Sequence, residues 1–465
     1  MSKKELVNPR EPNLNEDIFD YDSVPRIPFD GKILEEIDGE VVTFDPQEAI
    51  SRELVISDTT FRDGQQARPP YTAEQTARLF EMQSRLGGPN GIIRYSEFFL
   101  YSAKDRAAVE SCRKLNVEHP RITGWIRAEP GDFRLVREMG LDETGVLTSC
   151  SDYHIYHKLR KDRQRAFDDY VRLVETALEA GVRVRCHLED ITRADIDGFV
   201  LPFVQKLAEI SEQVPEELKV KVRLCDTMGF GITYPGAALP RSVPKLIYKL
   251  NHEGGIPPER MEWHGHNDFH KVHINAASAW LYGCNILNAS LLGFGERTGN
   301  PPLEAAIIEY MGLKGEDSGI DTRVITEIAD YFRNEVGVAV PSNYPFVGSD
   351  FNVTRAGIHA GGLERDERIY NIFNTGKLLD RPVRVAITDK SGIDGVVKWV
   401  NDYLGLDGKD RLRKIQLVKI GRWVVDQYEK HDRVTAISEE ELVEQIRLHL
   451  PDHCERLPAG RKAKP

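Results

Sequence analysis

Two histidines stand two residues apart in the run MEWHGHND, residues 261–268. Side chains at positions i and i+2 of an extended strand point to the same side, so His264 and His266 could both offer a ring nitrogen to one ion. Two histidines with this spacing and no further ligand are more often structural than metal-binding. Asp63 and Asn300 lie in the loops after two other short apolar runs, and their oxygens would complete a mixed ligand set. We therefore predict a divalent metal site made of Asp63, His264, His266 and Asn300; this mixed set of nitrogen and oxygen ligands suits Mn²⁺, Fe²⁺, Co²⁺, Zn²⁺ or Mg²⁺ and does not choose among them.

Arg62 directly precedes Asp63 in the run ISDTTFRDGQQ, residues 56–66. On a surface, such an arginine would be an ion-pair partner of little energetic weight. Beside a divalent ion, its guanidinium is well placed to hold a developing alkoxide or enolate oxygen, and we expect this second role. After the turn, Thr72 and Gln75 have the spacing of a helix capping box.

Further polar residues follow other short apolar runs. Glu189 closes the run VRVRCHLE, in which Arg185, His187 and Glu189 alternate onto one face. Glu189 could either solvate a strand end or act in catalysis, by binding a substrate or by orienting a base. His154 and Thr227 follow the runs on either side, so they would meet Glu189 if these runs are neighbouring strands.

Two glycine-rich runs contain residues that could bind a ligand or transfer a proton. The run GFGERTGN, residues 293–300, lacks the GxGxxG spacing and the Lys-Ser/Thr pair of phosphate-binding loops, so its glycines are expected to turn Asn300 inward. His359 lies in the run TRAGIHAGGL, residues 354–363, and could be a solvated loop histidine or a proton carrier.

These residues could act together only if a fold gathers the ends of the apolar runs. From residue 53 onward, short β-branched runs alternate with helical patterns, for example ELVISDTT before AEQTARLFEMQSRL. Eight such units fit into about 260 residues, and parallel strands joined by helical crossovers close into a barrel at this number. We therefore predict an α/β protein with a (β/α)8 TIM barrel, and a doubly wound open sheet is the alternative. In such a barrel, functional groups lie at the C-terminal ends of the strands.

The barrel is expected to occupy residues 51–315. Residues 1–50 contain five prolines and little periodicity, which predicts an extended N-terminal arm. After the barrel the pattern becomes helical, so residues 316–465 are predicted to form a mainly helical subdomain with a frayed basic tail.

Composition limits the classes of function. The chain has 74 acidic and 62 basic side chains among 465 residues, and its net charge of −12 disfavours nucleic acid and anionic membranes as partners. The six cysteines form no CxxC motif, which argues against a zinc knuckle or a disulfide framework. No apolar stretch of about 18 residues occurs, so we expect a cytoplasmic protein.

Five motifs taken together resemble a known superfamily: DTTFRDGQQ, LEDITRAD, LCDTMGFG, HGHND and GFGERTGN. In this order they resemble the DRE-TIM metallolyases, and specifically the Claisen-condensing branch of isopropylmalate, homocitrate, citramalate and Re-citrate synthases. The resemblance extends from about residue 54 to about residue 395. It implies a TIM barrel, a divalent metal on Asp63, His264, His266 and Asn300, and an oxyanion role for Arg62. With the resemblance, Mn²⁺ or Co²⁺ is the expected ion, and Mg²⁺ or Zn²⁺ is the alternative.

The resemblance also implies roles for residues whose chemistry the spacing leaves open. Glu189, Thr227 and His154 match positions that line a 2-oxoacid pocket. His359 and Tyr370 match a pair in the helical subdomain that assists proton transfer at an acetyl group. In relatives that subdomain reaches over a neighbouring chain, which implies a homodimer or a higher homo-oligomer.

Departures from individual branches narrow the expected reaction. Homocitrate synthases usually carry glutamate where this chain has Asp63, and the lyase branch carries a cysteine that GFGERTGN lacks. His187 stands where isopropylmalate synthases place a small residue, and a cation at this position would suit a second carboxylate of the substrate. Arg94 and Arg127 are further candidates for binding a dicarboxylate. The runs SDYHIYHKL and NYPFVGSDFNVTRAGIHAGG most resemble Re-citrate synthases.

We therefore expect an acyltransferase that condenses acetyl-CoA with oxaloacetate to give citrate and CoA. The alternative is an isopropylmalate, citramalate or homocitrate synthase that uses another 2-oxoacid. A remote alternative is a non-catalytic regulator that binds acyl-CoA or metal on a retained barrel.

Overall fold

The computed structural model describes residues 10–456, with side chains described up to residue 453. Within this part, packing divides the chain into two compact units: residues 26–338, and residues 10–25 together with 339–456. The limits expected from the sequence, with an arm up to residue 50 and a barrel up to residue 315, stay a prediction. No helix of the described part combines the length and the apolar character needed to cross a bilayer.

Eight parallel strands of the larger unit close into a barrel in the order β10-β3-β4-β5-β6-β7-β8-β9. The strands are β3 (Val55–Asp58), β4 (Ile93–Phe99), β5 (Arg121–Arg127), β6 (Glu143–Ser149), β7 (Arg183–Glu189), β8 (Lys221–Asp226), β9 (Met261–Gly265) and β10 (Ile286–Ala289). Closure is direct, because Ile286 of β10 pairs with Val55 on one side and Glu262 on the other. The predicted TIM barrel is therefore confirmed, and the open sheet is excluded.

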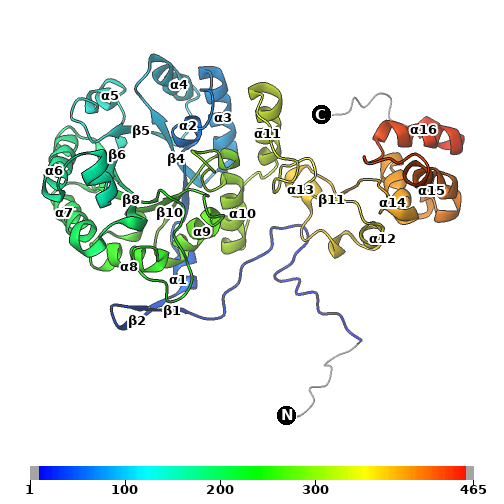
Figure 1. Cartoon of the computed structure of the whole chain (residues 1–465), viewed down its shortest axis with the longest axis horizontal. Helices are drawn as coiled ribbons and strands as arrows, with labels where there is room; N and C mark the ends of the chain where they lie inside the picture. The colour runs from blue at the N-terminus through cyan, green and yellow to red at the C-terminus, as the bar shows by residue number, and fades with distance from the viewer. Residues whose placement is uncertain (1–9, 457–465) are drawn as a thin grey trace, which may run out of the picture. The chain divides into compact units, whose positions relative to one another are not determined.

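Helices surround the strands (Figure 1). They are α2 (Asp63–Gln66), α3 (Ala73–Leu86), α4 (Ala103–Arg113), α5 (Phe133–Glu138), α6 (Arg163–Glu179), α7 (Leu201–Ser211), α8 (Val243–His252), α9 (Val272–Tyr282), α10 (Leu303–Lys314) and α11 (Val324–Tyr331). The capping box predicted for Thr72 and Gln75 is confirmed at the start of α3. The same helix buries Leu79 and Phe80 completely or nearly so, and each buried side chain of this size stabilises the fold by about 1.5–3 kcal/mol.

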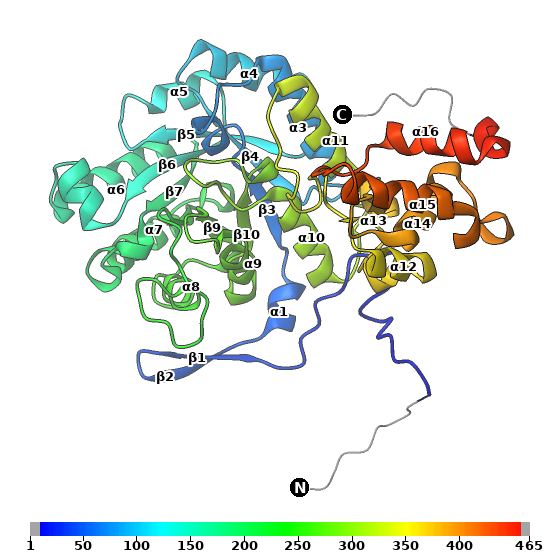
Figure 2. The same ribbon diagram turned by 45° about the vertical axis from the view of Figure 1, so that its right-hand side comes forward.

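A β-hairpin interrupts the expected extended arm. Strands β1 (Ile33–Ile37) and β2 (Glu40–Phe44) pair antiparallel, and α1 (Pro46–Ser51) follows them. Figure 2 shows the hairpin beside the barrel body. Glu35 fixes it there, because its carboxylate accepts a hydrogen bond from the Gly236 amide at 3.0 Å and lies 3.4 Å from the Lys245 ammonium.

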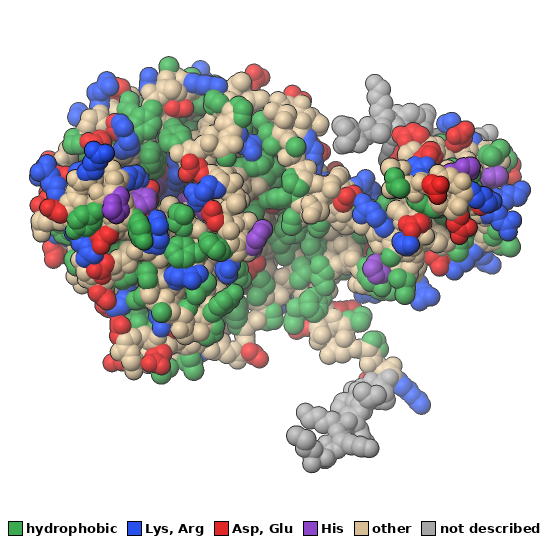
Figure 3. Space-filling view, in the orientation of Figure 1, with side chains coloured by type: hydrophobic (Ala, Val, Ile, Leu, Met, Phe, Trp, Pro, Cys, Tyr) green, Lys and Arg blue, Asp and Glu red, His purple; other side chains and the backbone are tan. Residues whose placement is uncertain are grey.

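The smaller unit is mainly helical, as predicted. It contains α12 (Gly357–Arg365), α13 (Thr375–Leu379), α14 (Gly392–Leu404), α15 (Lys414–Glu429) and α16 (Glu439–His449), with the short parallel pair β11 (Val353–Thr354) and β12 (Arg384–Val385). Val396, Val400, Leu417 and Ile446 are among the buried side chains of its core. Figure 3 shows acidic and basic side chains interspersed over both units.

Candidate metal and substrate site

Three side chains meet where β3 and β9 end. The Oδ2 atom of Asp63 lies 3.1 Å from Nε2 of His266 and 3.7 Å from Nε2 of His264. All three side chains are buried, and one ligand atom from each falls within 4.8 Å of the others. The structure therefore brings together three of the four predicted metal ligands, in a geometry that one ion could bridge.

Asn300 reaches the same place from the loop after β10. Its Nδ2 atom donates a hydrogen bond of 3.0 Å to the carbonyl of Gly265, which separates the two histidines. Its Oδ1 atom is buried and has no hydrogen-bond partner among the described residues. An unsatisfied buried acceptor costs about 1–3 kcal/mol, which a bound cation would recover. A set of oxygen and imidazole donors without thiolate fits a divalent metal ion.

The glycines of this loop are required by its tight path. A Cβ atom at Gly295 would come within 2.1 Å of Asn300 Oδ1, and one at Gly299 would come within 2.1 Å of the Gly293 carbonyl. Gly299 also has a positive φ of 98°. The loop is therefore wrapped around the Asn300 amide.

Electrostatics keep the cluster ready for a cation. Burial alone would raise the pKa of Asp63, but Arg62, His266 and His264 outweigh it and hold that pKa well below its usual range. Burial, reinforced by the neighbouring His266, lowers the pKa of His264 to about 3. At neutral pH the carboxylate is charged and the His264 imidazole is neutral, which are the forms that bind a metal. The Nδ1 atom of His264 lies 2.7 Å from Oδ1 of Asn288, a contact that fixes the ring.

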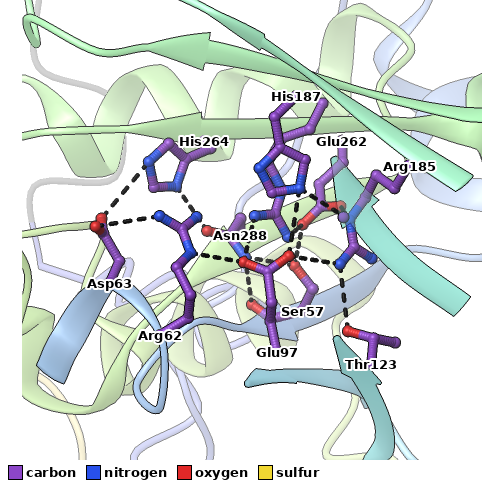
Figure 4. Close-up of polar contacts among 12 residues, drawn as sticks. Ser57, Arg62, Asp63, Glu97, Thr123, Arg185, His187, Glu262, His264 and Asn288 are labelled. Carbon is purple, nitrogen blue, oxygen red and sulfur yellow. Dashed lines mark hydrogen bonds and ion pairs between the residues drawn. The ribbon is translucent and has the colours of Figure 1, made fainter. Parts of the chain in front are cut away.

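Arg62 is buried beside this cluster. Its Nη1 atom lies 3.2 Å from Asp63 Oδ1, and its Nε atom donates a 2.8 Å hydrogen bond to Glu97. Figure 4 shows the guanidinium between the two carboxylates. Arg62 is thus held on both sides, so its orientation is set before any substrate arrives.

Glu97 lies at the centre of a buried network that the sequence did not reveal. Besides Arg62, it accepts hydrogen bonds from Arg185 at 2.7 Å and from Arg223 at 2.9 Å. Arg185 also pairs with Glu143 at 2.8 Å. TIM barrels usually fill this space with branched aliphatic side chains. Here charged side chains replace part of that filling.

A continuous series of ion pairs therefore runs along the barrel interior. Lys221 pairs with Glu143 at 2.7 Å, and the series continues through Arg185 and Glu97 to Arg62. We call these five residues the barrel ion-pair chain. Its two ends lie at opposite ends of the barrel, because Lys221 opens β8 whereas Arg62 follows β3.

The network changes what His187 can do. His187 is buried, with Nε2 3.3 Å from a Glu97 oxygen. Burial, with the positive charge of Arg223, lowers its pKa well below the ordinary value despite that carboxylate. Arg185 is likewise occupied by Glu97, Glu143 and Glu262. His187 therefore does not supply the cation expected at its position for a second substrate carboxylate, and Arg185 has no free donor to take its place.

Glu189 and His154 meet at the ends of β7 and β6. The Nδ1 atom of His154 lies 2.9 Å from a Glu189 oxygen, and Lys158 reaches both oxygens of the same carboxylate at 2.8 Å. Burial would raise the pKa of Glu189, but His154 and Lys158 outweigh it and lower that pKa to about 2. Lys158 was not predicted, because it approaches Glu189 only through a π-helical turn, Tyr153–Lys158.

The Thr227 side chain contacts the backbone of the turn that follows Glu189. Its hydroxyl accepts a 2.8 Å hydrogen bond from the Asp190 amide. Asp190 adopts a left-handed conformation with φ of 67°, and its carboxylate accepts a hydrogen bond from Ser151. Thr227 thus fixes the turn that follows Glu189.

Two predicted arginines are not brought to these groups. Arg94 is the second residue of β4 and lies at the N-terminal mouth of the barrel, where it pairs with Glu53 at 2.7 Å. Arg127 does end β5 at the C-terminal mouth, but its guanidinium is exposed and donates two hydrogen bonds to the Asp132 carboxylate, at 2.7 and 3.0 Å. Arg94 lies far from the site because β4 begins at the opposite mouth of the barrel. Arg127 lies at the correct mouth but is already paired with Asp132.

His359 and Tyr370 belong to the smaller unit. Their ring centroids lie 4.3 Å apart, and both side chains are exposed. His359 lies in α12, and Tyr370 follows a short 3-10 turn. The structure therefore forms the predicted pair, on a surface that also exposes Ile358, Ile369 and Ile372.

Comparison with known proteins gives a consistent result. The family described as HMGL-like matches residues 53–332, more than half of the chain. The citrate (Re)-synthase of Syntrophus aciditrophicus (strain SB) is 54% identical over 450 residues, which cover 96% of this chain and 69% of that protein.

Two further relatives extend the comparison. The citrate (Re)-synthase of Clostridium kluyveri is 46% identical over 453 residues, 97% of each chain. The 2-phosphinomethylmalate synthase of Streptomyces hygroscopicus is 36% identical over 406 residues, 86% of this chain and 89% of that protein. The resemblance predicted from the five motifs is confirmed: the chain belongs to the HMGL-like family.

Proposed function

We propose that this protein is a citrate (Re)-synthase, which condenses acetyl-CoA with oxaloacetate to give citrate and free CoA. The observation that carries the proposal is the 46–54% identity, over almost the whole chain, to two proteins of that name. The buried cluster of Asp63, His264 and His266 supports it, because a divalent ion is the cofactor that such a reaction would use.

Asp63, His264, His266 and Asn300 would hold the ion, and Mn²⁺ or Co²⁺ is the proposed identity. When bound, a divalent ion makes the carbonyl carbon of a 2-oxoacid more electrophilic. The cluster is buried, so water around the reacting carbonyl would be restricted.

Arg62 would stabilise the oxygen on which negative charge develops. When the acetyl methyl carbon attacks the ketone carbon, the carbonyl π-electrons move to oxygen and an alkoxide forms. The Arg62 guanidinium can donate to that oxygen, and its bond to Glu97 keeps it in place. Donors that are aligned before the reaction need little reorganisation during it.

The methyl proton needs a base, and we assign this role to His359 with Tyr370 as its neighbour. The imidazole would take one proton from the methyl carbon as the carbon–carbon bond forms, and the alkoxide would then take up a proton while the imidazolium loses its own, which restores the base. Water then cleaves the thioester and CoA leaves as the free thiol. The exposed apolar surface around the pair suits a homodimer or higher homo-oligomer, as in the condensing relatives that this sequence resembles.

Glu189, His154 and Thr227 would line the acceptor side of the pocket. Lys158 joins them, because its ammonium holds both oxygens of the Glu189 carboxylate at 2.8 Å.

Release of free thiol from acetyl-CoA tests the reaction. The full-length protein would be supplied with Mn²⁺ or Co²⁺ and with oxaloacetate, pyruvate, 2-oxoisovalerate or 2-oxoglutarate in turn. Oxaloacetate should give the fastest release, and a chelator should abolish it. Release with 2-oxoisovalerate that equals or exceeds that with oxaloacetate would refute the proposed acceptor.

The face of attack needs a second measurement. Citrate made from carbon-labelled acetyl-CoA would be degraded with a stereospecific lyase to locate the label. Label in the arm opposite to that given by a Si-type synthase supports the proposal. Tight binding of acetyl-CoA without thiol release on any acceptor would instead favour a non-catalytic binding protein.

A further inference from the structure

A second group of cations gathers at the opposite end of the barrel, where the strands begin. A cavity of about 170 Å³ opens there, and its wall includes Val55, Lys221 and Ile286, the first residues of β3, β8 and β10. Its charged lining comprises the cations Arg94, Arg183, Lys219, Lys221 and Arg260 and the anions Glu53, Glu216 and Glu259. The cavity is thus locally cationic in a chain whose net charge is −12.

Arg260 is the cation of this cavity without a carboxylate partner. It directly precedes β9, and only 9% of its surface is exposed. Its guanidinium makes no salt bridge within the described part of the chain, and its one hydrogen bond, to the Val220 carbonyl, is long at 3.5 Å. Burial lowers the pKa of Arg260, and the more distant Glu216 and Glu259 do not restore it. A buried charge without a counter-ion is unfavourable, so an anion from solution would be held there.

Arg183 adds unused donors to the same wall. Its Nη2 atom donates to the Glu216 carbonyl at 2.8 Å, and its Nη1 atom lies as far as 3.9 Å from Glu143. Its Nε atom is buried and has no hydrogen-bond partner among the described residues. Lys219, at the rim, is partly exposed and pairs with Glu216. Planar guanidinium groups with free N–H donors match the oxygens of phosphate and carboxylate groups.

The neighbouring space could hold the rest of a larger molecule. A cavity of about 570 Å³ shares Tyr95 and Arg183 with the first, so the two adjoin. Phe80 and Tyr95 contribute aromatic surface to the larger cavity. Together the two spaces lie within the size range of known small-molecule sites, which span about 300–1,000 Å³.

We propose that the N-terminal mouth of the barrel binds a small, multiply charged oxyanion, carried on phosphate or carboxylate groups, between Arg260, Arg183 and Lys219. The charged group occupies the smaller cavity, and any larger body extends into the adjoining one. This site lies at the opposite end of the strands from Asp63 and does not depend on the proposed reaction.

Calorimetric titration of the full-length protein tests the site, with pyrophosphate, ATP and tricarballylate as probes. Pyrophosphate and ATP present phosphates without and with a nucleoside, whereas tricarballylate presents carboxylates alone. At least one probe should bind, and Arg260→Gln should weaken that binding by about tenfold or more. The probe that binds most tightly identifies which charged group, phosphate or carboxylate, the site prefers.

Two further variants separate binding from folding. Lys219→Glu changes a partly exposed rim residue and should also weaken binding, even if Arg260→Gln does not fold. Arg134→Gln, on the exposed face of α5, removes a cation outside the cavity and should leave binding unchanged. Equal affinities in Lys219→Glu, Arg134→Gln and the unaltered protein would overturn the proposal, as would the absence of binding by all three probes.

A crystal soaked in selenate would locate the anion directly. An anomalous scattering peak in contact with Arg260 and Arg183 supports the site. A peak found only at Asp63, Arg62 or other places outside the cavity contradicts it.

Discussion

Replacing Glu97 by glutamine removes the negative charge that Arg62, Arg185 and Arg223 share inside the barrel. The side chain keeps its size, so the change is mainly electrostatic. Removing one partner of a buried ion pair costs about 3–5 kcal/mol, because the remaining charge is left uncompensated. We expect the free energy of unfolding to fall by about this amount in Glu97→Gln.

The same change should also slow the reaction. Arg62 keeps its contact with Asp63 but loses the hydrogen bond to Glu97 that sets its other side. Losing a donor to an oxyanion lowers kcat by about 10²–10³-fold. A donor that remains but is no longer held should cost less, so we expect a fall in kcat of about 10–100-fold with little change in KM.

Glu143→Gln is the matched control, because Glu143 belongs to the same barrel ion-pair chain but does not touch Arg62. It pairs with Lys221 and Arg185, so its loss should destabilise the fold comparably. Urea unfolding would measure stability, and thiol release by the folded protein would measure kcat. A similar fall in kcat for both variants, or an unchanged kcat in Glu97→Gln, would refute a positioning role for Glu97.

Three other outcomes follow from the site. Asp63→Asn should lower metal affinity by at least about 100-fold, since substitution of residues that merely support a ligand already costs 10–100-fold; metal content after dialysis measures this. Gly295→Ala should destabilise by about 1–3 kcal/mol, because its Cβ would meet Asn300 Oδ1 at 2.1 Å, whereas Gly131→Ala, with open space, should not. The fold lowers the pKa of Glu189 from 4.5 to about 2, so the unaltered protein should have a larger free energy of unfolding than Glu189→Gln, by about 3 kcal/mol above pH 4.5. This difference should be lost as the pH falls toward 2. A difference in unfolding free energy that does not change with pH would contradict this reasoning.

The barrel and part of its site could be predicted from local patterns. Each strand and helix of a β/α unit leaves its own periodicity, and the unit count determines closure. The histidine pair was recognisable because side chains two apart share a face of a strand, as His264 and His266 do. Asp63 was recognisable because it follows a strand at the C-terminal mouth.

The buried network could not be predicted in this way. Glu97, Arg223 and Glu262 lie within strands, and a charge within a strand can point outward to solvent as easily as inward. Only the pairing of one strand with the next decides which charges meet, and that pairing is not local in sequence. Arg94 illustrates the converse: it has the right chemistry for an anion, but it lies at the start of β4.

One missed element did carry a local signal. Asp38 and Gly39 join β1 and β2 with φ values of 51° and 85°, which is the backbone that tight two-residue hairpins require. An Asp-Gly pair between apolar runs is a strong predictor of such a turn. The five prolines of residues 1–50 predict an extended chain, but none of them lies within residues 33–44, where the hairpin forms.

The barrel ion-pair chain, together with the neighbouring pair Arg223 and Glu262, limits how the interior of this protein can diverge. Apart from Arg62 and Asp63, which compensate each other, three interior carboxylates are matched by three interior cations: Glu97, Glu143 and Glu262 with Arg185, Arg223 and Lys221. A single neutral substitution leaves an unmatched charge, whereas the loss of one acid together with one base restores neutrality. In a barrel with an aliphatic interior, each interior position can be substituted independently during evolution. Here an acid and its basic partner are expected to be substituted together, because a sequence that has lost only one of them is less stable than the sequences with both or with neither.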